Sequence, residues 1–187
     1  ERFDNILQSI HSDFEVIVAG SFRRNSSLPG KEKYKKTSGD VDVLLFHETV
    51  QDKSDISQKS LLKEFVKKLK KSDIYIDYIN NGNSKFTALI KLPDLPVRHI
   101  DVRLFPQNTK TFSILHFTGS ANNNKKMRSV AIKKGYSLSE YGLTNLETEE
   151  MVYCNTEEEI YNYLDMDYLE PHLRKIIIHS TLSIAIK

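Results

Sequence analysis

The sequence lacks several features that mark specialised classes of protein. Its single cysteine, Cys154, cannot form a disulfide within the chain, which fits a reducing compartment. Its longest apolar runs are only a few residues long, too short to cross a membrane as a helix. It shows no secretory signal, internal repeat or low-complexity tract. These absences exclude a disulfide-stapled scaffold and a repeat protein, and we expect no membrane partner.

Length and composition then indicate an ordinary globular protein. The 187 residues are 39% hydrophobic and 28% charged, enough to bury a core without staples. This length predicts one domain, or one domain with a small annex. The chain begins with Glu1 rather than methionine, so we expect it to be processed or cut from something longer.

The net charge of +2 hides an uneven distribution of charge. Lysine and arginine gather in residues 23–36, 59–71 and 125–134, whereas residues 147–170 hold nine carboxylates and no basic side chain. Such separation suits a protein that turns one face toward a polyanion. The alternative is that the lysines only solvate helix surfaces.

Hydrophobic periodicity predicts an α+β fold in two parts. Residues 1–108 are expected to form a mixed β-sheet with helices, and residues 109–187 a smaller α+β unit with an apolar tail. In the first part we expect helices over 3–11 and 57–71, and strands over 13–19, 41–46, 74–79, 85–92 and 97–105. Asn81-Gly82 predicts a hairpin, and residues 25–37, which contain Pro29-Gly30, a loop or loose hairpin.

The second part is expected to hold three helices and two short strands. The helices cover 110–118, 121–134 and 156–164, and the strands lie near 137–144 and 147–153. Thr156 and Glu159 form a capping box at the start of the last helix. The apolar segment 176–186 either packs on the core or leads into further sequence.

Three carboxylates are candidates for catalysis. Asp40 and Asp42 alternate along a predicted strand, so their side chains share one face, and Asp101 lies in another apolar strand. Adjacent carboxylates repel each other unless a cation lies between them. Hard oxygen ligands of this kind suit Mg²⁺, and a third carboxylate from a neighbouring strand completes a two-metal site. A lone Asp-x-Asp is, however, most often only a pair of carboxylates exposed to solvent.

A Gly-Ser pair upstream strengthens this interpretation. Gly20 and Ser21 sit at a predicted strand-to-helix turn, where free backbone N–H groups can hold a phosphate. Glycine allows a close approach, and serine adds a donor. Taken alone, the pair is an ordinary turn that caps a helix.

The order of these motifs resembles the nucleotidyltransferase superfamily, and within it the family X, polymerase-beta-like DNA polymerases. The matching blocks span most of the chain and are Gly20-Ser21-Phe22-Arg23-Arg24, residues 38–45 (SGDVDVLL), Asp101-Val102-Arg103-Leu104, Phe117-Thr118-Gly119-Ser120, residues 124–128 (NKKMR), residues 134–143 (KGYSLSEYGL) and Tyr168-Leu169-Glu170-Pro171. The resemblance implies a catalytic palm over 1–108 and, over 109–187, a subdomain that binds the nascent base pair.

The resemblance implies that Asp40, Asp42 and Asp101 are both catalytic and metal-binding. They would hold two Mg²⁺ ions, with Mn²⁺ as an alternative, and Asp101 would help deprotonate the primer 3′-hydroxyl. The implied nucleotide-binding residues are Gly20, Ser21, Arg24, Gly39, His116, Phe117, Gly119 and Asn124. Arginine suits a phosphate-binding position because its planar fork matches phosphate oxygens.

The implied DNA-binding residues are Lys125, Arg128, Arg98, His99 and Arg103. Two positions depart from the family pattern. His116 stands where an aromatic pair is usual, which bears on the exclusion of ribonucleotides, and His99 stands where arginine usually orients the third aspartate. The spacer over 25–37 is also longer and richer in lysine than usual.

We therefore expect a template-directed DNA polymerase that adds deoxynucleotides (dNTPs) to a primer 3′ end and fills short gaps in DNA repair. The alternatives are a template-independent nucleotidyltransferase and a catalytically reduced DNA-binding module. About 19 residues precede Gly20, so we expect no amino-terminal lyase domain within this chain; an upstream lyase domain or a repair ligase is an expected partner. The expected location is intracellular, in the nucleus, or in the cytoplasm if the protein is viral.

Overall fold

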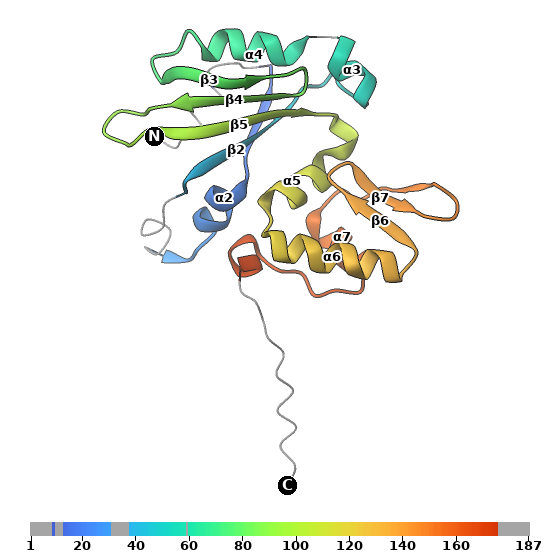
Figure 1. Ribbon diagram of the computed structural model, residues 1–187. Helices are drawn as coiled ribbons and strands as arrows, with labels where there is room; N and C mark the ends of the chain where they lie inside the picture. Colours follow the sequence, from blue (N-terminus) through green and yellow to red (C-terminus); the bar gives the residue numbers. More distant parts are fainter. Residues whose placement is uncertain (1–8, 10–12, 31–37, 59, 176–187) are drawn as a thin grey trace.

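The computed structural model of the chain describes residues 9, 13–30, 38–58 and 60–175. These residues form a larger unit around a five-stranded sheet and a smaller unit around a three-stranded sheet (Figure 1). The architecture is α+β, as the sequence predicts. The expected helix over 3–11, apart from Ser9, and the apolar segment 176–186 lie outside the described residues.

The larger sheet has the strand order β1-β2-β5-β4-β3. Its strands are β1 (Glu15–Val18), β2 (Asp40–Phe46), β3 (Tyr75–Asn81), β4 (Lys85–Ile90) and β5 (Arg98–Phe105). β2 and β5 run parallel, and the other pairs are antiparallel. The predicted Asn81-Gly82 hairpin is confirmed between β3 and β4, where the Gly82 N–H donates to the Lys85 carbonyl at 2.8 Å.

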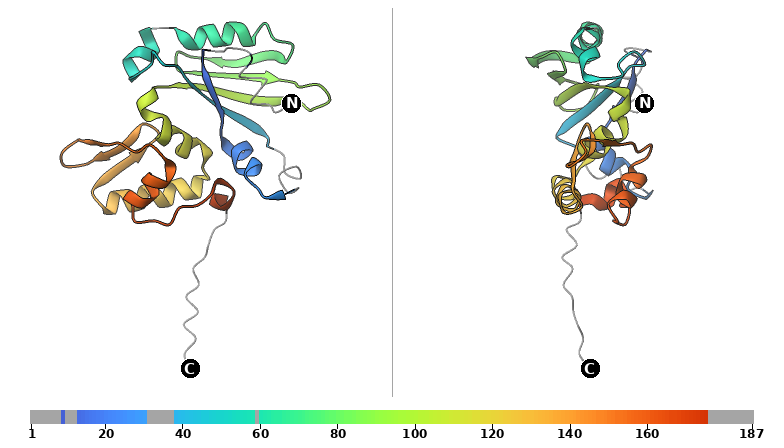
Figure 2. Two further views of the ribbon diagram at one scale, coloured as in Figure 1. Left: turned by 180° about the vertical axis from the view of Figure 1, so that it is seen from behind. Right: turned by 90° about the vertical axis from the view of Figure 1, so that its right-hand side faces the viewer.

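The two faces of this sheet are covered by different helices. Val41, Val43 and Leu45 point from β2 into the main core, where the amphipathic helix α4 (Leu61–Leu69) covers them. Leu44 and Phe46 point to the opposite face, where they pack near the helix α5 (Lys110–Thr118). Figure 2 shows α5 between the large sheet and the rest of the smaller unit.

Two helices differ from the sequence-based expectation. The helix predicted over 57–71 begins only at Leu61, and a separate helix α3 (Lys53–Gln58) precedes it. Ser60 adopts a left-handed conformation with φ of 50°, which interrupts the helical path before the apolar repeat begins. A further helix, α2 (Gly20–Ser26), extends two residues into the predicted loop 25–37, of which residues 31–37 are not described.

The smaller unit follows the predicted order of elements with two corrections. The strand expected near 147–153 is confined to Met151–Val152. The segment 137–144 is not one strand but a hairpin, because the turn at Glu140-Tyr141 divides it. The elements are the 3₁₀ helix η2 (Gln107–Thr109), α5, α6 (Ala121–Lys133), β6 (Tyr136–Ser139), β7 (Gly142–Asn145), β8 (Met151–Val152), α7 (Glu157–Tyr163) and the 3₁₀ helix η3 (Pro171–Lys175).

The predicted capping box of α7 is present. The Thr156 hydroxyl accepts a hydrogen bond from the Glu159 N–H at 3.1 Å, and the Glu159 carboxylate accepts one from the Asn155 N–H at 2.7 Å. In the part of the chain that the structure describes, no helix is long and apolar enough to cross a membrane.

Candidate active site

The three candidate aspartates lie on one face of the large sheet. Asp42 is the direct partner of Asp101 across the parallel pairing of β2 with β5, and Asp40 precedes Asp42 by two residues on the same face. This is the face that carries Leu44, Phe46 and Phe105 where α5 covers it. The face is thus apolar under α5 and acidic beyond it, at the amino ends of β2 and β5.

The environments of Asp42 and Asp101 shift their pKa values in opposite directions. Burial, together with the charges of Asp101 and Asp40, raises the pKa of Asp42 above its ordinary value, although Arg103 and Arg24 act against this rise. Burial alone would also raise the pKa of Asp101, but hydrogen bonds from Thr87 and Lys85 and the charges of Lys85 and Arg103 outweigh it, so the net shift is downward. A cation beside Asp42 would relieve the repulsion.

The carboxylates are not drawn together into a metal-binding cluster. Within residues 13–30, 38–58 and 60–175, no group of three histidine, cysteine, aspartate or glutamate side chains is arranged to hold an ion. Asp101 instead faces β4, where the Thr87 hydroxyl donates to Oδ1 at 2.6 Å and Lys85 Nζ lies 3.2 Å from Oδ2. As expected, the three aspartates share one face of the sheet. The ion-binding cluster that was also expected is not seen among the described residues.

The Gly20-Ser21 turn lies directly against Asp42. The Ala19 N–H donates to the Asp42 carbonyl at 2.8 Å as the chain leaves β1, and α2 starts at Gly20 with φ of +61°. Glycine is required here for two reasons. The left-handed conformation disfavours other residues, and a Cβ atom would collide with the Asp42 carboxylate.

One cleft collects the residues that the sequence assigns to the nucleotide. All eight of those residues line it, and Asp40, Asp42 and Ala121 complete its wall. They come from the start of α2, the start of β2, the end of α5 and the first turn of α6. The cleft therefore joins the two units of the fold, and its lining combines two carboxylates with a guanidinium and an amide.

Two polar side chains of the cleft are held in place by backbone carbonyls at the end of α5. Arg24 Nη1 donates to the Thr118 carbonyl at 2.5 Å, and Asn124 Nδ2 donates to the His116 carbonyl at 2.7 Å. A Cβ atom on Gly119 would lie 3.3 Å from Arg24 Nη1, so the missing side chain leaves room for the guanidinium. These contacts hold the Arg24 guanidinium and the Asn124 amide in place in the lining of the cleft.

The aromatic side chains at the end of α5 form a second wall. His116 lies 4.9 Å from the Phe117 ring, and the Arg103 guanidinium lies 4.9 Å from the Phe117 ring centroid. Burial lowers the pKa of His116, even though Glu140, 3.8 Å away, acts in the opposite direction. The shift favours the neutral form of His116.

The candidate DNA-binding residues do not all share one surface. Lys125 and Arg128 are exposed on α6, which begins at the cleft. His99 and Arg103 lie on the same face of β5 as Asp101. Arg98 alternates to the other face, and its guanidinium donates to the adjacent Val97 carbonyl at 3.2 Å. Arg98 is thus separated from the other four.

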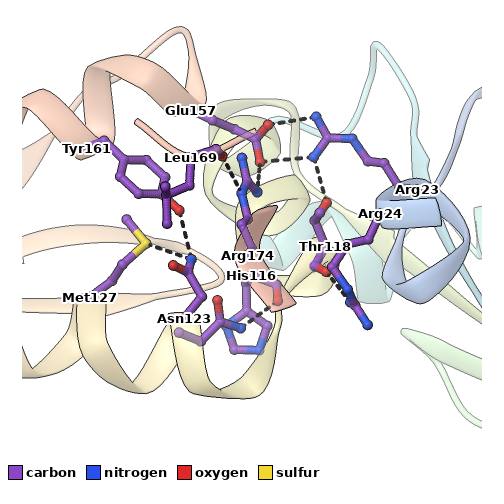
Figure 3. Close-up of polar contacts among 11 residues, drawn as sticks. Arg23, Arg24, His116, Thr118, Asn123, Met127, Glu157, Tyr161, Leu169 and Arg174 are labelled. Atoms are coloured by element: carbon purple, nitrogen blue, oxygen red, sulfur yellow. Dashed lines mark hydrogen bonds and ion pairs between the residues drawn. The ribbon is translucent and has the colours of Figure 1, made fainter. Parts of the chain in front are cut away.

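A buried ionic network that the sequence analysis missed ties α2 to the smaller unit (Figure 3). Glu157 accepts hydrogen bonds from Arg23 at 3.0 and 2.6 Å and from Arg174 at 2.8 Å. Arg23 also donates to the Thr118 hydroxyl at 2.7 Å. We call Arg23, Glu157 and Arg174 the latch. In the sequence, the only hint of this network is the Arg23-Arg24 pair. Glu157 gives none, because it resembles any acidic residue in a first helical turn.

Two family models match most of the chain. The family model described as DNA polymerase beta palm matches residues 1–107, and the one described as DNA polymerase beta thumb matches residues 113–175. DNA polymerase lambda of Arabidopsis thaliana is 24% identical over 94% of this chain, and that of Rattus norvegicus is 28% identical over 88%. The chain spans 35% and 29% of the lengths of these two relatives.

Solved structures of Leishmania infantum polymerase beta have the same fold. Its ternary gap complex is 25% identical, with a TM-score of 0.79, over 92% of this chain and 68% of that one. Its ternary P/T complex is 28% identical, with a TM-score of 0.78, over 91% of this chain and 73% of that one.

Proposed function

Because the chain belongs to the polymerase-beta-like DNA polymerases of family X, we propose that it adds deoxynucleotides to the 3′ end of a primer under the direction of a template. The observation that carries this proposal is the shared cleft, which the carboxylates of Asp40 and Asp42 line together with the guanidinium of Arg24. A deoxynucleoside triphosphate brings negative phosphates to a cationic wall and its reacting phosphorus to an acidic one. The cleft thus has the charge pattern that nucleotidyl transfer requires.

Polymerases of this family depend on metal ions, and we propose that this chain uses two Mg²⁺ ions held by Asp40, Asp42 and Asp101, with Mn²⁺ as an alternative. The residues fit such ions, because carboxylates are the ligands that Mg²⁺ prefers. Burial raises the pKa of Asp42, and the negative charges of Asp101 and Asp40 add to this rise. When bound, the ions supply charge neutralisation for the attacking oxygen and the leaving pyrophosphate.

The chain's own residues would bind and orient the nucleotide. Gly20 and Ser21 offer backbone N–H groups at the start of α2, and Arg24 adds a fixed cation for the outer phosphates. Phe117 and Asn124 stand where the sugar and base would lie, with the Asn124 amide already oriented by the His116 carbonyl. Asp101 would lie closest to the primer hydroxyl and accept its proton.

The basic surface would hold DNA through its phosphates, independently of sequence. Lys125 and Arg128 are exposed on α6, and His99 and Arg103 share a face of β5 with Asp101. Phosphate contacts from such residues weaken steeply with salt. We propose short gaps in DNA as the substrate, in an intracellular repair role, since the related polymerase beta was solved with gapped DNA. A lyase domain upstream and a repair ligase are the partners such a role implies.

Primer extension on gapped DNA tests the proposal. We expect incorporation of the template-complementary dNTP, and its loss in the variants Asp42→Asn and Asp101→Ala. The control is Asp94→Asn, which changes an exposed carboxylate in the loop after β4. Equal incorporation with Asp42→Asn would refute the metal assignment, and equal incorporation without a template strand would favour the template-independent alternative.

A further inference from the structure

Both oxygens of the Asp101 carboxylate are engaged by β4. Thr87 lies directly opposite Asp101 in the antiparallel pairing of β4 with β5, and its hydroxyl donates to Oδ1 at 2.6 Å. Lys85, two residues earlier on the same face, places its ammonium 3.2 Å from Oδ2. Each oxygen of Asp101 therefore has a donor of its own.

The alternation of β4 explains why these two polar residues face the site. Phe86, Ala88 and Ile90 fill the main core, so the residues between them must point to the opposite face. Lys85 and Thr87 are the polar residues of that face, and the register of β4 on β5 sets them beside Asp101. Their contacts follow from sheet pairing and not from a flexible loop.

Lys85 and Thr87 differ in how easily their donor groups can move away from the Asp101 carboxylate. The side chains of Lys85 and Asp101 are 34% and 29% exposed, so the ammonium can withdraw into solvent on its flexible stem. Thr87 has a short, β-branched side chain with few rotamers, which keeps its hydroxyl at Oδ1. A carboxylate oxygen has two lone pairs, so the bond from Thr87 is compatible with a cation on Oδ2, whereas Lys85 competes for that oxygen.

We propose that Lys85 and Thr87 are positioning residues that control when Asp101 becomes available to a divalent cation. Thr87 fixes the orientation of the carboxylate, and Lys85 occupies Oδ2 until the cation replaces it. This inference rests on the role of Asp101 as a metal ligand in the proposed function. It accounts for a set of aspartates that share a face without forming a three-carboxylate cluster among the described residues.

Titration of the protein with Mn²⁺ alone, without DNA or nucleotide, tests this inference, with free Mn²⁺ measured by electron paramagnetic resonance. We expect Lys85→Met to tighten Mn²⁺ binding about fivefold, the factor that corresponds to a part-exposed ion pair. Lys85→Arg, which keeps the charge, should remain within about twofold of the natural protein. The matched control is Lys67→Met, which removes an exposed lysine from α4 on the other side of the sheet.

Removal of the Thr87 hydroxyl is expected to change Mn²⁺ affinity in the opposite direction. Loss of a hydrogen bond that orients a metal ligand weakens binding about tenfold or more, so Thr87→Val should bind Mn²⁺ more weakly and Thr87→Ser should restore affinity. Circular dichroism confirms folding of each variant, and Thr87→Ala replaces Thr87→Val if that variant does not fold.

Two outcomes would overturn the inference. One is equal Mn²⁺ affinity for Lys85→Met and Lys67→Met, and the other is unchanged or tighter binding by the Thr87 variants that lack the hydroxyl. The proposed function has a separate test in Asp42→Asn and Asp101→Asn. If these bind Mn²⁺ as the natural protein does, the metal assignment fails, and the inference fails with it.

Discussion

Removal of the charge on Glu157 is the most informative perturbation of the latch. The Glu157 side chain is 10% exposed and the Arg174 side chain is fully buried, so the pair is removed from water. Glu157→Gln keeps the size of the side chain but leaves two guanidinium groups without their counter-charge. Breaking a buried ion pair on one side costs about 3–5 kcal/mol. Because Arg23 remains 28% exposed, we expect the lower end of that range, about 3 kcal/mol.

Thermal unfolding at pH 7 measures this loss directly. For a protein of this length, about 3 kcal/mol corresponds to a fall in Tm of about 6–12 °C. Glu158→Gln is the matched control, because it changes an exposed glutamate next to Glu157 in the same first turn of α7. It should shift Tm by no more than about 2–4 °C, since exposed charges near a helix start contribute up to about 1 kcal/mol.

The pH dependence gives an independent check. Burial alone would raise the pKa of Glu157, but hydrogen bonds and charges from Arg23 and Arg174 outweigh burial and hold the pKa below its ordinary value of 4.5. A carboxyl whose pKa is lowered on folding contributes its stability above the unfolded value and loses it as the pH falls through the folded value. The difference in stability between the natural protein and Glu157→Gln should therefore reach its full size at pH 7 and shrink below pH 4.5. A variant that melts within 2 °C of the natural protein at pH 7 would refute the reasoning, as would a difference that does not change with pH.

Three further predictions concern the cleft and its supports. Gly20→Ala should lower incorporation about a hundredfold in single-turnover assays, because the added Cβ displaces the Asp42 carboxylate; unchanged incorporation would contradict this. Arg24→Lys should raise the KM for dNTP about tenfold in steady-state assays while changing kcat little, since lysine lacks the fork that donates to the Thr118 carbonyl and would leave a second nitrogen for phosphate; a fall in kcat alone would contradict it. Thr156→Ala should lower the free energy of unfolding in urea by about 1 kcal/mol through loss of the helix cap, and no change would show that the cap adds nothing.

The latch also connects the stability of the fold to the cleft. Arg23 and Arg24 are neighbours on α2, and they bond to the Thr118 hydroxyl and the Thr118 carbonyl respectively. The last turn of α5 is thus held to α2 through one residue. Loss of the latch should therefore affect the position of the Arg24 guanidinium in the cleft as well as Tm.

Local patterns in the sequence were sufficient for most elements of the fold. Alternation in β2 put Asp40 and Asp42 on one face and Val41 on the other, because successive side chains of a strand point to opposite sides. Asn81-Gly82 marked a hairpin, and Thr156 with Glu159 marked a helix start. The errors arose where a short break changed the path, at Ser60 before α4 and at the turn before Gly142.

What the sequence by itself determined was the set of chemical groups and their order along the chain. Beyond the cleft that the family resemblance implied, the tertiary structure decided which groups meet. The parallel register of β2 on β5 brought Asp42 opposite Asp101, the register of β4 gave Asp101 its donors Thr87 and Lys85, and chain folding brought Glu157 to Arg23 across 134 positions. Such pairings depend on strand register and on packing between units, and neither leaves a periodic signal in the residues that take part.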